Sequence, residues 1–84
     1  MEINIKIVYA YKWGYYKLIV KDNNDNDIPF VVGRVYDKEY EAEIAAGIMK
    51  AMFDSVEEAK DFNRDLFDFN IRAVLRLIDA PGKW

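Results

Sequence analysis

Alternating apolar and polar positions run along the first quarter of the chain. From residue 3 to residue 11 the odd positions are isoleucine or tyrosine, whereas the even positions are asparagine, lysine, valine and alanine. Successive side chains of a β-strand point to opposite faces, so this pattern predicts a strand with one buried face. The alternation stops at Trp13-Gly14 and resumes over residues 15–21. Because glycine accepts the backbone angles of a tight turn, the two segments are predicted to form a β-hairpin.

A polar loop and a third strand are expected next. Residues 22–27 are all aspartate or asparagine, and such side chains hydrogen-bond their own backbone in turns. Pro29 marks the start of a strand that continues to about Tyr36. Both faces of this strand are largely apolar, so its inward face is left open.

Helical spacing replaces the alternation after residue 36. Asp37 is of a type that caps helix N-termini, and alanine, isoleucine and methionine then form a wide apolar stripe to about Phe53. This pattern predicts a first helix. Ser55 followed by Glu58 fits a capping box, and apolar residues recur at three- and four-residue spacing to Phe69, which predicts a second helix.

The end of the second helix is ambiguous. From residue 67 to residue 77 every odd position is apolar and nearly every even one is polar, which is typical of a strand. A helix running from 55 to 78 would be about 36 Å long and would project past strands of seven or eight residues. We therefore favour a helix over 55–69 with Asn70 near its C-cap, and a fourth strand over 71–79. A long second helix is the alternative.

These elements predict one α+β domain spanning residues 1–84. The favoured order is β-β-β-α-α-β, with a three- to four-stranded, mainly antiparallel sheet packed under two helices in two layers. The alternative order is β-β-β-α-α.

Composition excludes most enzyme chemistry. Among 84 residues there is no cysteine and no histidine, so thiol nucleophiles, imidazole bases and zinc fingers are ruled out. Glycine-rich phosphate loops are also absent, because the four glycines are isolated. We expect a protein that is not an enzyme and that needs neither a metal nor a cofactor. The lack of a signal-like or membrane-spanning segment predicts a cytoplasmic location.

Charge is divided unevenly along the chain. The formal net charge of −3 hides a hairpin with four lysines and no acid, followed by residues 37–68 with ten acids and four bases. Two candidate binding surfaces result. The first is an acidic helical layer that would bind a protein partner: Glu39, Glu41, Glu43, Glu57, Glu58, Asp61 and Asp65. The second is a basic, aromatic hairpin that would bind nucleic acid, since bases stack on aromatic rings while lysines hold phosphates: Lys6, Lys12, Trp13, Tyr15, Lys17 and Lys21.

One segment resembles an enzyme family. Residues 41–46, Glu-Ala-Glu-Ile-Ala-Ala, follow three predicted strands and are similar to the ribonuclease H helix that carries a metal-binding glutamate. The resemblance implies that Glu43 is that glutamate and that Asp79 stands for the carboxylate at the end of the family's fourth strand. The first strand lacks the acid that the family's two-metal chemistry requires, so the resemblance implies a degenerate domain without activity.

The leading prediction is a small binding or regulatory protein that occupies a surface on another macromolecule. A regular array of carboxylates imitates the phosphate backbone, so the partner would be a nucleic-acid-processing enzyme. The small size and the lack of cysteine and of catalytic residues fit an inhibitor from a phage or mobile element, of the anti-CRISPR or anti-defence type. Direct binding of single-stranded nucleic acid through the hairpin is the alternative. With 15% aromatic residues, the chain has more apolar side chains than a two-layer core covers, so a homodimer through the sheet face or the C-terminal segment is also expected.

Overall fold

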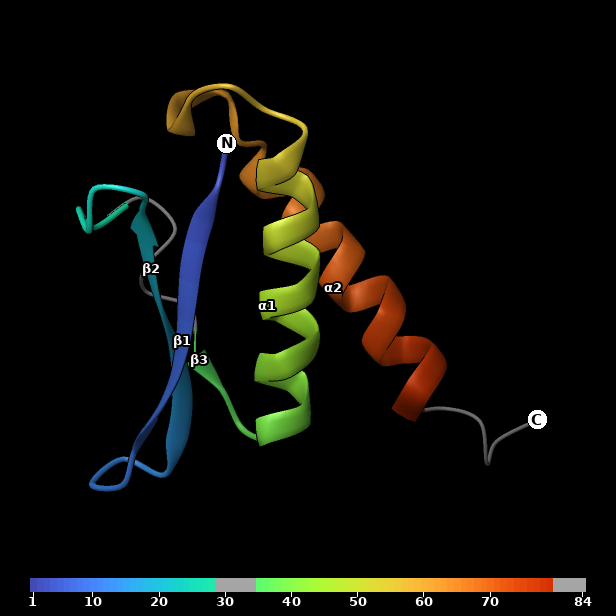
Figure 1. The fold of residues 1–84 in the computed structure, drawn as a ribbon. Coiled ribbons are helices and arrows are strands. Elements are labelled where there is room, and N and C mark those ends of the chain that lie inside the picture. The colour runs from blue at the N-terminus through green and yellow to red at the C-terminus, as the bar shows by residue number, and fades with distance from the viewer. Residues whose placement is uncertain (29–34, 80–84) are drawn as a thin grey trace.

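The computed structural model describes residues 1–28 and 35–79. Within them the fold is α+β: a three-stranded antiparallel sheet in the order β1-β2-β3, with two helices packed against it (Figure 1). The elements in chain order are β1 (Ile3–Ala10), β2 (Tyr15–Asp22), β3 (Val35–Tyr36), α1 (Glu39–Asp54), the short 3₁₀ helix η2 (Ala59–Asp61) and α2 (Arg64–Asp79).

The predicted hairpin is confirmed, and its register follows the alternation of the sequence. Ile5 pairs with Val20 and Ile7 with Leu18, so the apolar side chains of both strands share one face. Between the strands, Gly14 has a φ of 73°, which an L-residue with a side chain rarely adopts. The loop over 22–27 is also as expected, because the Asp22 carboxylate accepts hydrogen bonds from the backbone N–H groups of Asn24 and Asn26.

Helix α1 lies over the apolar face of the sheet, and α2 packs alongside α1 (Figure 1). The α1 side chains at the centre of the protein are small at one end and large at the other. Ala42 and Ala45 are fully buried, which lets the helix approach its neighbours closely, and Met49 and Phe53 fill the space further along. The predicted helix to about residue 53 is confirmed, although its N-cap is Lys38, one residue after Asp37.

An aromatic cluster joins the two helices. The rings of Phe53 in α1 and Phe62 in the connection are stacked with centroids 4.2 Å apart, and Phe62 meets Phe67 of α2 at 5.5 Å. All three side chains are buried. The amino group of Met1 closes this end of the core by donating hydrogen bonds to the carbonyl oxygens of Phe53 and Val56.

The predicted start of the second helix at residue 55 is wrong. Ser55 ends α1 instead, since its hydroxyl donates a hydrogen bond to the carbonyl oxygen of Met52 at 2.8 Å. Asn63 is the actual N-cap of α2, with its side-chain oxygen accepting from the Leu66 N–H at 3.0 Å. Burial of Phe62 decides between the two starts, because a helix running continuously from residue 55 would not turn the chain to stack Phe62 on Phe53.

The predicted fourth strand over residues 71–79 is also wrong, because these residues belong to α2. The helix has 16 residues, so it is about 24 Å long and the overhang expected of a 24-residue helix does not arise. Asn70, expected near a helix C-cap, lies inside α2 and points its amide nitrogen at the Met52 sulfur, 3.7 Å away.

The misleading alternation has a specific cause. One apolar row of α2 faces the core at positions 67, 71 and 75, and a second row faces outward at 69, 73 and 77. Each row has the four-residue spacing of a helix. The two rows are offset by two residues, so together they fill every odd position and imitate a strand. The part of the third strand predicted over residues 29–34 lies outside the described residues.

Replacing Phe62 by alanine is expected to lower the free energy of unfolding by about 3–5 kcal/mol, because the change removes a buried ring that packs on two others. Urea denaturation followed by circular dichroism measures this. The control is Tyr11→Ala, which removes an exposed ring of the hairpin loop and should cost less than about 0.5 kcal/mol. Equal losses for the two variants would contradict the role given to Phe62.

The position of the cap gives a second prediction. Asn63→Ala should cost about 1 kcal/mol of unfolding free energy, whereas Asn63→Asp, which keeps the acceptor oxygen, should cost only a few tenths. Ser55→Ala removes a single exposed hydrogen bond, so its cost in unfolding free energy should be at most about 0.5 kcal/mol. If Ser55→Ala proved more costly than Asn63→Ala, the helix start at Asn63 would be wrong.

Candidate nucleic-acid interface

The sheet has one face that the helices leave open. The pairs across β1 and β2 on this face are Asn4–Lys21, Lys6–Ile19, Val8–Lys17 and Ala10–Tyr15. They bring together Lys6, Lys17, Lys21 and Tyr15, four of the six residues predicted for the basic hairpin. Val35 of β3 pairs with Lys17 and extends the same face.

The lysines of the open face differ in their surroundings. Lys6 and Lys17 occupy diagonal positions on neighbouring strands, which places their Cα atoms about 7–8 Å apart. Both are exposed, and neither forms an ion pair within the described residues. Lys21, in contrast, forms ion pairs, because its Nζ lies 3.8 Å from the Oδ1 atoms of both Asp25 and Asp27. The uncompensated positive charge is therefore at Lys6 and Lys17.

Aromatic side chains gather at the tip of the hairpin, which extends past the first turn of α1 (Figure 1). Trp13 is 73% exposed and Tyr11 is 75% exposed. The turn that presents Trp13 is held by two hydrogen bonds, because the N–H groups of Trp13 and Gly14 both donate to the Ala10 carbonyl oxygen, at 3.0 and 2.9 Å. Lys12 lies in the same turn and is also exposed.

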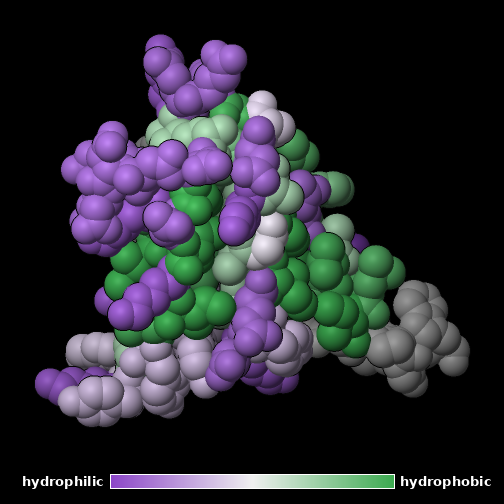
Figure 2. Space-filling model, in the orientation of Figure 1, coloured by the Kyte–Doolittle hydropathy of each residue, from purple (hydrophilic) through white to green (hydrophobic). Residues whose placement is uncertain are grey.

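Tyr9 and Tyr11 occupy odd positions of the alternation, which predicts that they lie on the buried face, yet both are exposed. Tyr9 does point to the side of the helices, where its ring lies 4.7 Å from that of Tyr16, but half of its surface stays exposed. Alternation reports which face a side chain takes; it does not report whether a helix reaches far enough to cover it. Figure 2 shows the tip as a group of pale, weakly hydrophilic side chains separate from the green apolar ones.

The predicted acidic layer is divided in two by the structure. Glu39, Glu41 and Glu43 lie in the first turns of α1. The other four acids lie around the connection to α2, at the opposite end of a 16-residue helix that is about 24 Å long. They are Glu57, Glu58, Asp61 and Asp65. Glu58 is paired with Lys60 at 3.1 Å.

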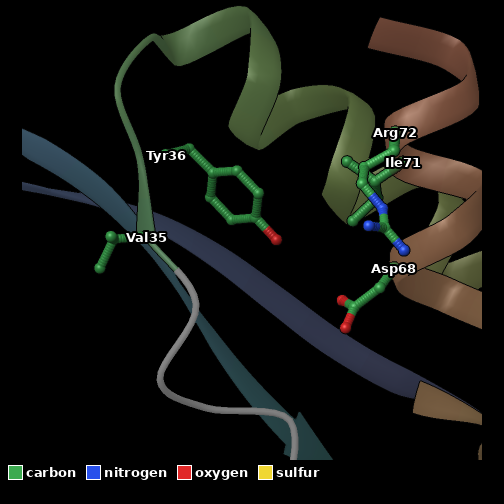
Figure 3. A pocket seen from close by; sticks show the side chains of 5 residues that line it. All are labelled: Val35, Tyr36, Asp68, Ile71 and Arg72. Carbon is green, nitrogen blue, oxygen red and sulfur yellow. The ribbon is translucent and has the colours of Figure 1, made fainter. Parts of the chain in front are cut away.

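A pocket that the sequence did not indicate lies between β3 and α2. Its volume is about 340 Å³ and its described lining includes Tyr36, Asp68 and Arg72. Figure 3 shows the Tyr36 hydroxyl and the Asp68 carboxylate directed into the same space. The helical interval of four residues between Asp68 and Arg72 could have indicated that they share a face, but nothing in the sequence places that face beside β3.

The structure contradicts one feature that the ribonuclease H resemblance implies. Asp79, which the resemblance places at the end of a fourth strand, is the last residue of α2. Glu43 is exposed on α1. Within residues 1–28 and 35–79, no group of three or more acidic side chains is arranged to hold a metal ion.

Among the described residues, no helix combines the length and the apolar character that crossing a membrane requires. Comparisons of the chain with protein-family models, with curated proteins and with solved structures each gave no match.

Proposed function

We propose that this protein binds single-stranded nucleic acid through the open face of its sheet and the tip of its hairpin. The observation that carries the proposal is the juxtaposition of Lys6 and Lys17, which form no ion pair among the described residues, with a highly exposed Trp13 at the end of the same two strands. In this role the protein acts by binding, without catalysis.

Each part of the surface matches one property of single-stranded nucleic acid. Its phosphates are attracted by the lysine ammonium groups, and its unpaired bases stack on exposed aromatic rings regardless of sequence. A sheet face suits this ligand because side chains stand nearly perpendicular to it, so lysines and rings project in parallel. Tyr15 lies between Lys17 and Trp13 along the chain and offers an intermediate, half-buried ring.

The uneven distribution of charge over the molecule orients the bound nucleic acid. The acids of residues 37–68 lie in the helical half of the molecule, and the open face carries the lysines. A polyanion is repelled by the helical half and attracted to the open face, so contact is confined to one side.

A second candidate function rests on the acids around the helix connection. Glu57, Asp61 and Asp65 are exposed, close in sequence, and at the end of the molecule opposite the hairpin tip (Figure 1). This surface would occupy the basic groove of a nucleic-acid-processing protein by imitating phosphates. The division of the predicted acidic layer into two groups leaves fewer carboxylates for this contact, which is why we place it second.

Fluorescence anisotropy of a labelled oligothymidylate at low salt tests the proposed function. Trp13→Ala should weaken binding by about 1–3 kcal/mol without changing the salt dependence, because stacking is not ionic. Lys6→Gln and Lys17→Gln should each reduce the slope of log K against log salt by about 0.7, because each removes one phosphate contact.

The matched control is Lys60→Gln, because Lys60 is exposed and already paired with Glu58 at the far end of the molecule. It should leave both the affinity and the salt slope unchanged. Absence of binding to DNA and RNA oligomers at low salt would overturn the proposal. Binding that Lys60→Gln weakens as much as Lys17→Gln would show nonspecific attraction instead of a defined face.

A further inference from the structure

Helix α2 carries a second apolar row on its outer side. Phe69 is 62% exposed and Leu77 is 70% exposed, and Leu66 and Ala73 lie on the same side of the helix. In Figure 2 the green side chains continue across α2 to the surface. The described part of the chain does not cover this row. A contiguous apolar strip of this kind on a small protein marks an interaction surface.

We propose that this face binds the same face of a second copy, with the two α2 helices antiparallel about a two-fold axis. In the register that centres the axis between residues 69 and 73, Leu66 lies within one residue, about 1.5 Å, of the level of Leu77 of the second copy. Phe69 then lies opposite Ala73 of the second copy, so a large side chain meets a small one twice.

The structure provides a place for that phenylalanine. A hollow of about 330 Å³ lies beside Ala73, and the side chains around it are Phe69, Arg72 and Arg76. The aliphatic stems of arginines form apolar walls while their charged ends stay in water. The hollow and the ring that would fill it are both on this helix face, which is what a two-fold contact requires.

The charged side chains beside the apolar row favour a second copy as the partner, with its α2 helix antiparallel to the first. Asp65 and Arg76 flank the row on the same side, because eleven residues correspond to just over three helical turns. On one helix they are about 16 Å apart, too far for an ion pair, and neither forms an ion pair within the described residues. In the antiparallel pair, Asp65 of each copy lies near Arg76 of the other. A parallel pair would place Asp65 at the level of Asp65 and Arg76 at the level of Arg76, so neither ion pair would form.

The expected dimer is weak. A single 16-residue helix face buries less area than a standard protein interface, and contacts of that size are transient. Sedimentation velocity over a series of protein concentrations should therefore show a shift from monomer to dimer in the micromolar to millimolar range. Phe69→Ala should move the midpoint at least about tenfold higher, because it empties two central contacts.

A charge exchange tests the register. Asp65→Arg and Arg76→Asp should each weaken the dimer by about tenfold, because each turns two attractions into two repulsions. The double variant should recover to within about threefold of the original. An equimolar mixture of the two single variants should also recover, because both ion pairs re-form in the mixed dimer. Circular dichroism of each variant at low concentration checks that the fold is intact.

Three outcomes would overturn the proposal. The first is a monomer at the highest attainable concentration. The second is a dimer that Phe69→Ala leaves unchanged, which would place the contact on another surface such as the open sheet face. The third is failure of both the double variant and the mixture to recover, which would exclude the antiparallel register.

Discussion

The stacking of Phe62 between Phe53 and Phe67 is the contact on which the arrangement of the helices depends. Phe62 is buried although it belongs to the connection between the helices, so the chain must turn back over the end of α1 to place it there. That turn delays the start of α2 to Asn63 and fixes its direction alongside α1. Once the direction is set, Phe67 and Ile71 face the core, and Phe69 and Leu77 on the same helix face solvent. One aromatic contact thus decides which side of α2 is available to a partner.

Local signals in the sequence were sufficient for the hairpin and the first helix. The alternation over residues 3–21 placed the lysines on the face that the structure leaves open, because register on a strand is fixed once one face is apolar. The prediction of a fourth strand in the C-terminal third of the chain is wrong for a physical reason. A helix with apolar rows on both sides produces the same spacing as a strand, and only a contact distant in sequence, Phe62 on Phe53, distinguishes the two.

The candidate surfaces were predicted with unequal success because they depend on different information. The basic face needed only the two-residue period of a hairpin. The acidic layer needed the spatial relation of α1 to the connection that follows it, and the sequence does not show that the acids lie at opposite ends of a helix. Exposure of Tyr11 likewise depends on where α1 begins, which alternation within the strand does not report.

The central position of α1 separates the two proposed contacts. It lies between the sheet on one side and α2 on the other, so the open sheet face and the outer face of α2 point in opposite directions (Figure 1). A nucleic acid on the sheet and a second copy on α2 therefore do not compete for space. In the proposed dimer the two sheets lie on the outside. A single-stranded nucleic acid long enough to reach both open faces would be held by two sites. Binding at the second site is then intramolecular, which raises the overall affinity above that of one sheet face without any new contact.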